Sequence, residues 1–217
     1  MKIAYINPNA TQSMTDGIVT MAQEALYGAE IVGVTNTDGP PAIEGPEDGA
    51  AAVPGVLVRA RAARAEGADA IVIACFDDTG LTEAQAALDC PVLGIGQAAY
   101  AMAMLLGRRF SVVTSLPVSI PVIEENIAAL GFAGICASVR ASGLPVLTID
   151  EGAPETLDRI AEEIEAARVQ DQAGCVILGC AGMSPLRAEL AARAGLPLID
   201  GVAASAQLAR AAVACAG

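Results

Sequence analysis

The second half of the chain repeats the pattern of the first half, and this repeat constrains the fold more than any other feature. The segment from Ala68 reads as an apolar strand, a cysteine, a short loop, an Ala-rich helix, an apolar strand after a proline, a glycine and a second Ala-rich helix. The segment from Ala173 reads the same way. The strands expected at Lys2 and Arg109 are separated by nearly the same number of residues as these two segments. The chain is therefore predicted to contain two similar halves.

Short apolar runs alternate with Ala-rich stretches along both halves. A wholly apolar run such as 70–74, AIVIA, is typical of a buried strand, and Gly- and Pro-rich segments mark loops. The predicted strands cover 2–6, 30–34, 70–74, 91–94, 110–114, 135–139, 175–178 and 196–199. The predicted helices cover 14–27, 49–66, 80–88, 95–106, 120–130, 154–170, 184–194 and 201–214. Strands that alternate with helices predict an α/β fold with mostly parallel sheets.

We expect each half to form one lobe, with an N-terminal α/β lobe over 1–105 and a C-terminal α/β lobe over 106–217. Each lobe is predicted to be a mostly parallel sheet flanked by helices. The two lobes should face each other about a pseudo-two-fold axis, with the site in the cleft between them. Whether the last helix of the first lobe crosses over to the second stays open.

Composition and charge exclude several functional classes. Hydrophobic residues make up 54% of the chain, which argues against intrinsic disorder. The net charge is −13 and no Lys/Arg cluster is present, so neither a nucleic-acid partner nor binding to an anionic membrane surface is expected. No uncharged apolar run is long enough for a transmembrane helix, and the first residues lack a signal-peptide pattern. A cytoplasmic location is therefore predicted.

The chain contains no histidine, which removes Ser-His-Asp and Cys-His nucleophiles and most catalytic zinc sites. No metal site is predicted, and acid–base chemistry must come from Asp, Glu, Cys, Lys or Tyr side chains. None of the six cysteines forms a CxxC pair, and in a reducing compartment all six should be free thiols. Four of them have no counterpart in the other half and are interpreted as structural: Cys90, Cys136, Cys175 and Cys215.

Cys75 and Cys180 occupy matching places in the two halves, each after a buried strand and before a helix. A single cysteine at a strand end is usually a small core residue, so only the matched pair points to chemistry. Ligands of open α/β sheets bind outside the carboxyl ends of the strands, which would place both thiols at one cleft. The amino end of the following helix should favour a thiolate at each cysteine.

Two opposed thiols suit the inversion of a carbon atom next to a carbonyl group. One thiolate removes a proton from one face, and the other thiol returns a proton to the opposite face. The enolate between them needs hydrogen-bond donors on its oxygen. The backbone N–H groups that follow each cysteine are natural donors: Phe76, Asp77, Ala181 and Gly182.

Four segments, in order along the whole chain, resemble the hydantoin racemase branch of the Asp/Glu racemase superfamily. They are NPNAT at 7–11, GPPAIEG at 39–45, ACFDDTGL at 74–81 and LGCAGM at 178–183. The resemblance implies an isomerase that works without a cofactor and uses two thiols to racemise 5-substituted hydantoins or allantoin. It also implies a small-molecule substrate as the partner and a homo-oligomeric assembly.

The resemblance also implies roles for individual residues. Cys75 and Cys180 match the two catalytic thiols, and Phe76–Asp77 and Ala181–Gly182 match the backbone donors. The expected substrate-binding residues further include Asn9, Glu44, Thr114 and Ser115. Amino-acid racemases of this superfamily tend to carry Asn or Thr after the first cysteine and Thr after the second. This chain lacks those polar residues, which fits a less charged ring as the substrate better than an amino-acid zwitterion.

Other patterns have simpler interpretations. Asp77–Asp78 could suggest a metal site, but hydrogen bonding or a helix cap is favoured because no third ligand lies nearby. Gly94-Ile95-Gly96 is a weak match to a dinucleotide loop that lacks its third glycine. The segment 154–170 is predicted to be an outer, solvated helix. Phe76 either shapes the pocket or only packs. Further candidates for the pocket lining are Ile43, Pro117, Val118 and Ile120.

Two alternative functions stay open from the sequence. The first is another enzyme of the superfamily, either an Asp/Glu-type amino-acid racemase or a cis–trans isomerase with a cysteine nucleophile. The second is a bilobed small-molecule binding protein without catalysis. The sequence leaves undetermined the preferred 5-substituent, the choice between hydantoins and allantoin, the enantiomer that each thiol serves, and the oligomer size.

Overall fold

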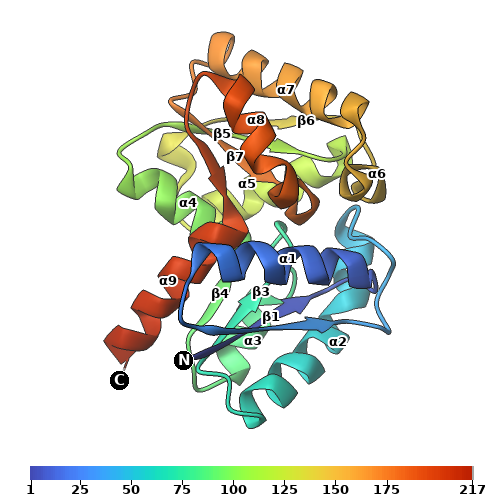
Figure 1. Ribbon diagram of the computed structural model, residues 1–217, viewed down its shortest axis with the longest axis vertical. Coiled ribbons are helices and arrows are strands. Elements are labelled where there is room, and N and C mark those ends of the chain that lie inside the picture. The colour runs from blue at the N-terminus through green and yellow to red at the C-terminus, as the bar shows by residue number, and fades with distance from the viewer. Residues whose placement is uncertain (217) are drawn as a thin grey trace.

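A computed structural model describes residues 1–216 and contains two four-stranded parallel sheets (Figure 1). The strand order is β2-β1-β3-β4 in the first sheet and β6-β5-β7-β8 in the second. The strands are β1 (Lys2–Asn7), β2 (Glu30–Thr35), β3 (Ala70–Ile73), β4 (Val92–Gly94), β5 (Phe110–Thr114), β6 (Cys136–Ala141), β7 (Cys175–Gly179) and β8 (Leu198–Asp200). The two orders are equivalent, which confirms the repeat and the predicted α/β class.

The helices follow the predicted order with shifted ends. They are α1 (Gln12–Ala25), α2 (Pro46–Ala65), α3 (Leu81–Ala87), α4 (Ile95–Leu105), α5 (Ile120–Ala129), α6 (Val146–Glu151), α7 (Pro154–Val169), α8 (Arg187–Ala194) and α9 (Gly201–Ala216). Short 3₁₀ helices are η1 (Pro117–Ser119), η2 (Ala133–Ile135) and η3 (Ala181–Leu186). No helix in this described part of the chain is long and apolar enough to cross a membrane.

Two local differences from the sequence prediction concern the second half. The short helix α6 lies in a segment for which the sequence predicted neither a strand nor a helix, and Gly152 caps its end in the left-handed conformation. The predicted helix 184–194 begins instead as the 3₁₀ helix η3, and regular α-helix starts only at Arg187. Pro185 lies inside η3, and a proline disfavours the α-helical conformation of the residue before it, Ser184.

The strands are apolar because helices cover both faces of each sheet. All four residues of β3 are buried. Alternate residues of β1 enter different cores: Ile3 and Tyr5 belong to a central core, whereas Ala4 and Ile6 pack with α2 and α3. In the second sheet, inward-facing residues such as Phe110 join the same central core, and the opposite face packs against α7 and α8. The central core therefore joins the two sheets.

The last helix of each half packs against the sheet of the other half. The helix α9 runs beside α1 of the first half, whereas α4 lies with the second half (Figure 1). The Tyr5 phenol in β1 is hydrogen bonded to the Ser205 hydroxyl in α9, with an oxygen–oxygen distance of 3.0 Å. In the other direction, the Tyr100 ring of α4 stacks on Phe110 of β5 at a centroid distance of 5.6 Å. The crossing that the sequence left open for α4 thus occurs for both helices.

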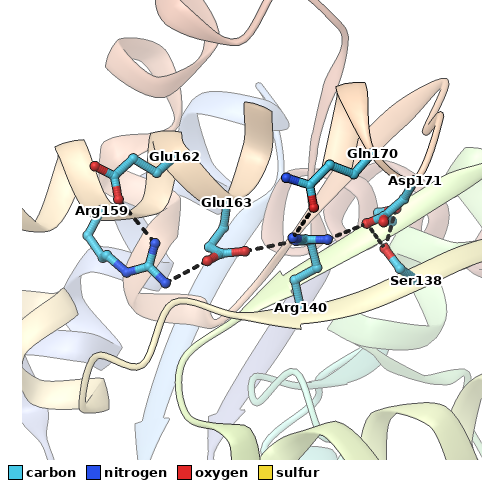
Figure 2. Close-up of polar contacts among 8 residues, drawn as sticks. Ser138, Arg140, Arg159, Glu162, Glu163, Gln170 and Asp171 are labelled. Carbon is cyan, nitrogen blue, oxygen red and sulfur yellow. Dashed lines mark hydrogen bonds and ion pairs between the residues drawn. The ribbon is translucent and has the colours of Figure 1, made fainter. Parts of the chain in front are cut away.

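The outer helix α7 is amphipathic, as predicted, and its polar face carries an ion-pair network (Figure 2). Arg140, on the edge strand β6, pairs with Glu163 and Asp171, and each N–O distance is 2.8 Å. Arg159 also pairs with Glu163, from the same helix. Asp171 further accepts a hydrogen bond from the Ser138 hydroxyl at 2.6 Å. These contacts connect the edge of the second sheet to the helix that covers it.

Candidate active site

The carboxyl ends of the central strands of both sheets open onto one pocket. The first half contributes Asn9, Met14, Ile43, Ala74, Cys75, Phe76 and Asp77. The second half contributes Thr114, Ser115, Ser119, Val146, Gly179, Cys180 and Ala181. Of these residues only Cys75 and Asp77 are not classed as buried. The pocket is therefore shared by the two halves and largely closed.

Cys75 and Cys180 line this pocket from equivalent positions. Cys75 follows β3, the central strand beside β1, and Cys180 follows β7, the central strand beside β5. The structure therefore brings together the two thiols that the sequence paired. Both cysteines are free, and the Cys180 side chain is almost wholly buried.

Burial controls the protonation of both thiols. Loss of water raises the pKa of Cys75 well above its usual range, and the negative charge of Asp77 raises it further. Burial likewise raises the pKa of Cys180 to about 12. Hydrogen bonds from nearby backbone N–H groups act in the opposite direction: those of Asp77 on Cys75, and of Gly182 and Met183 on Cys180. These N–H groups favour the thiolates, but burial has the larger effect on both pKa values.

Asp77 brings a carboxyl group to the same pocket. Burial raises its pKa to about 7, and no hydrogen-bond partner for its side chain is found within residues 1–216. Only its backbone carbonyl is engaged, as the acceptor of a hydrogen bond from the Asn126 side-chain amide at 2.8 Å. The Asp77 carboxyl is therefore available to other groups in the pocket.

The neighbouring Asp78 has a structural role. Its carboxyl oxygens accept hydrogen bonds from the backbone N–H groups of Gly96 at 2.9 Å and Gln97 at 2.7 Å, at the start of α4. This confirms hydrogen bonding or a helix cap over a metal site for Asp78. A Cβ atom at Gly94 would lie 2.0 Å from the Asp78 carboxyl, so the Gly-Ile-Gly segment makes room for this cap. No cluster of three or more potential metal ligands occurs within the described residues.

Asn9, Thr114 and Ser115 all line the pocket, as predicted, but differ in what they offer to a ligand. The Asn9 side-chain oxygen accepts from the Thr11 N–H at 2.9 Å, which turns its amide nitrogen toward Met14. The Thr114 hydroxyl donates to the Gly179 carbonyl at 2.9 Å, so its proton is already engaged. The Ser115 hydroxyl has no hydrogen bond to the described protein atoms and faces the pocket.

Two of the predicted site residues do not line the pocket, and a third lines it but also packs against the core. The Glu44 carboxylate accepts a hydrogen bond from the Val146 N–H at 2.7 Å and does not line the pocket. Gly182 also lies outside the lining, although its N–H points to Cys180. Phe76 lines the pocket, but its ring packs edge-on against Tyr100 at a centroid distance of 5.7 Å.

Several residues at the site were not singled out from the sequence. The Thr79 side chain lowers the pKa of the Cys75 thiol, and the Met183 N–H, which donates to the Cys180 carbonyl at 3.0 Å, lowers that of the Cys180 thiol. The lining also includes Met14, Ser119 and Val146. Of the further lining candidates, Ile43 reaches the pocket, whereas Pro117, Val118 and Ile120 are not part of its lining.

The four cysteines without a counterpart lie away from the pocket. Cys175 is buried inside β7, Cys136 begins the edge strand β6, and Cys90 precedes β4. Cys215 is exposed near the end of α9. All four are free thiols, and none lines the pocket of Cys75 and Cys180.

Known proteins resemble this chain in both sequence and fold. A family profile described as Asp/Glu/Hydantoin racemase matches residues 3–209. A hydantoin racemase of Rhizobium meliloti is 46% identical and covers 97% of this chain and 88% of its own length. A hydantoin racemase of Pseudomonas sp. strain NS671 is 36% identical over 96% of this chain and 84% of its own. The structure of an allantoin racemase from Klebsiella pneumoniae superposes with a TM-score of 0.95 at 37% identity, covering 99% of this chain and 88% of that one.

Proposed function

Because the chain belongs to the Asp/Glu/hydantoin racemase family, we propose that it is an isomerase that racemises 5-substituted hydantoins. In this proposal Cys75 and Cys180 are the two groups that transfer protons. One observation carries it: the two thiols follow equivalent central strands of the two sheets and line one largely closed pocket. The matched placement supports a reaction that needs one group on each face of a planar intermediate.

The reaction would proceed by proton transfer at C5 of the ring. The thiolate of one cysteine forms an S–H bond as the C5–H bond breaks, and the electron pair moves toward the neighbouring carbonyl oxygen. The second thiol then donates its proton to the opposite face of C5 and becomes the thiolate. The next turnover starts from the other enantiomer with the two roles exchanged. A thiol whose pKa is raised by burial is a stronger base once ionised, which suits the weakly acidic C5–H bond.

The charges of the pocket support a neutral ring as the substrate. Neither lysine nor arginine lines the pocket, and its own titratable side chains are acidic. A free amino acid brings a carboxylate, which gains nothing from such surroundings and loses its hydration. The hydantoin ring is uncharged and offers carbonyl oxygens and N–H groups. The unengaged Ser115 hydroxyl and the Asn9 amide nitrogen are its expected hydrogen-bond partners.

Allantoin is a second candidate substrate of the same class. It is a hydantoin that carries a ureido group at C5. The superposition with the allantoin racemase of Klebsiella pneumoniae favours it, whereas the more identical relative from Rhizobium meliloti is a hydantoin racemase. Both candidates present the same ring to the two thiols, so they differ only in the group that occupies the remainder of the pocket.

The decisive experiment follows optical rotation and deuterium uptake at C5 in D₂O, with reductant and without cofactor. Single enantiomers of benzylhydantoin, isopropylhydantoin and allantoin are compared with aspartate and glutamate. We expect loss of rotation with deuterium uptake for at least one of the ring substrates, above its spontaneous rate. Exchange of aspartate or glutamate alone would instead assign an amino-acid racemase, and binding without exchange would assign a binding protein.

Cysteine variants test the assignment of the two thiols. Cys75→Ser and Cys180→Ser should each lower the racemisation rate by orders of magnitude, because a serine hydroxyl is far less acidic than a thiol. Cys215→Ser is the matched control, since that thiol is exposed and remote from the pocket. Near-wild-type turnover in either pocket variant would exclude the two-thiol mechanism. A covalent adduct between one cysteine and the substrate would point to a nucleophilic isomerase.

We also propose a homo-oligomeric state for the chain. The side chains of Met104, Leu105 and Leu106 are exposed together at the end of α4, and their burial against a second copy would stabilise an assembly. Light scattering coupled to size-exclusion chromatography measures the oligomer size, and a monomer at micromolar concentration would contradict the proposal. The cytoplasmic location stays a prediction from the sequence.

A further inference from the structure

Three acidic side chains line one pocket without a cation among them. Cys75, Asp77 and Cys180 belong to the same lining, which contains neither lysine nor arginine. The Asp77 carboxyl has no hydrogen-bond donor within the described residues, although burial alone makes its charged form costly. Such an unpartnered carboxyl is not required to hold the fold together. Because Asp77 lines the same pocket as the thiols, we expect its carboxyl to have a functional role there.

Asp77 also lies where the pocket meets the solvent. A second, more open cleft on the outer side of the loop is lined by Gly45, Thr79, Glu83, Glu125, Asn126 and other residues, including Asp77. Asp77 is the one residue that lines both this outer cleft and the pocket of the thiols. A proton on its carboxyl can therefore exchange with water without passage through the buried lining.

The other charged and titratable groups around Asp77 do not neutralise it. Asp78 is engaged with the N-terminus of α4, and Tyr100 and Asp150 add no positive charge on the inner side. Glu83 and Glu125 line the outer cleft and are also acidic. A negative charge on Asp77 raises the pKa of both thiols, and it does so without competition from a cation in either lining.

Neighbouring acids in a water-poor pocket ionise one at a time, because a second negative charge is opposed by the first. Burial raises the pKa of Asp77 to about 7, and the pKa values of both thiols lie higher, so the first charge of the empty site rests on Asp77. At this single charge, a thiolate forms when a proton moves from sulfur to the carboxylate.

We propose that Asp77 shares a single negative charge with Cys75 and Cys180 and accepts the proton that a thiol releases. The step is balanced internally: the thiol and the carboxylate become a thiolate and a carboxylic acid, and no further reactant is needed. Asp77 thus acts through the thiols and positions their proton, in addition to any contact with the ring. The proposal deepens the two-thiol function above and rests on it for its catalytic meaning, but the charge sharing exists without substrate.

The test measures thiol ionisation in the substrate-free protein. Iodoacetamide alkylation of Cys75 and Cys180 is followed from pH 5.5 to 9.5, with each cysteine quantified by mass spectrometry. In the wild type the logarithm of the rate should rise up to about pH 7 and then flatten, because above this pH the single charge that Asp77 shares with the thiols is fully present and the thiolate share of it stays constant. In Asp77→Asn the flattening should disappear, and alkylation at pH 9 should be at least about tenfold faster than in the wild type.

Two further variants separate this role from general effects. Asp77→Glu keeps a titratable carboxyl and should retain the flattening. Glu125→Gln removes one negative charge from the outer cleft but not from the pocket, and its profile should match the wild type. Thermal unfolding of each variant shows whether it is folded in the pH range used.

Each outcome bears on a different claim. Coincident alkylation profiles for wild type and Asp77→Asn, with only a raised KM for the ring substrate, would overturn the charge sharing and leave a binding role. A lost flattening in Asp77→Asn together with a shifted pH profile of kcat would support it. If the flattening is lost but the wild type racemises no hydantoin, the proposed function fails while the charge sharing stands.

Discussion

The Glu44 carboxylate accepts a hydrogen bond from the backbone N–H of Val146 at 2.7 Å, although the two residues lie in different halves of the chain. A second contact runs beside it, in which the Ser13 hydroxyl donates to Asp150 at 2.9 Å. Ile43, next to Glu44, and Val146 itself are both buried and line the pocket. These two hydrogen bonds therefore connect segments of the two halves at one wall of the pocket.

Glu44→Ala should loosen the pocket wall that Val146 forms. Loss of one hydrogen bond to a partly exposed carboxylate costs about 1 kcal/mol, which predicts a KM for the ring substrate raised about fivefold. Glu44→Gln retains an acceptor oxygen and should stay close to the wild type. Glu47→Ala, which removes an exposed carboxylate a short distance along the chain, is the control for charge. A Glu44→Gln variant as impaired as Glu44→Ala would indicate that the charge itself contacts the substrate.

The two buried carboxyls should make the protein less stable as the pH rises. Burial raises the pKa of Asp77 to about 7 and that of Asp78 to about 8, whereas both ionise near 3.8 in the unfolded chain. The folded state therefore holds more protons between these limits, and the free energy of unfolding falls as the pH rises from about 4 to 8. Urea denaturation at pH 5 and pH 8 measures the change. Asp77→Asn should reduce this pH dependence, and a stability that increases over the interval would contradict the expectation.

Asp78→Asn should destabilise the start of α4. The asparagine side chain offers one acceptor oxygen in place of two, so the N–H of Gly96 or Gln97 loses its partner inside the protein. The expected loss in the free energy of unfolding is about 1–3 kcal/mol. Asp89→Asn is the matched control, because that carboxylate is exposed and pairs only with Arg64 on the surface. Equal urea midpoints for the two variants would show that Asp78 does not cap the helix.

Arg140→Met should loosen the contact between α7 and the edge strand β6. Its carboxylate partners Glu163 and Asp171 are only 16% and 19% exposed. Without Arg140, Asp171 would be left partly buried without a cation, and Glu163 would keep only its pair with Arg159. We expect a loss of about 2–3 kcal/mol in the free energy of unfolding. Arg168→Met breaks an exposed pair with Glu165 on the same helix and should cost less than about 0.5 kcal/mol. Similar losses in both variants would mean that the network of Figure 2 adds nothing beyond a surface pair.

The internal repeat made much of this architecture predictable. It paired Cys75 with Cys180 because each follows an apolar strand in the same local pattern, and the structure places both on one pocket. The strands themselves were recognisable because burial on both faces removes polar residues from them, as in β3. Local patterns were therefore sufficient to predict the order of the strands and of the longer helices, and to pair the two thiols.

Other features depend on contacts that leave no local pattern. The helix α6 is too short to show a helical period, and with it the sequence concealed Val146 as a lining residue and as the partner of Glu44. The placement of Thr79 near Cys75 and of Met183 near Cys180 depends on how each loop turns after its strand. The crossing of α9 depends on Tyr5 and Ser205, which are far apart in the sequence.

The crossed helices impose an order on the completion of the molecule during its synthesis. The first sheet leaves the ribosome early, but the helix that covers its inner face, α9, is among the last segments to be made. Until then the apolar inner surface around Tyr5 and Val72 has no α9 against it, even though α1 is already present. The nascent first half is therefore a partly uncovered intermediate, and it acquires its full core only after α9 has been made.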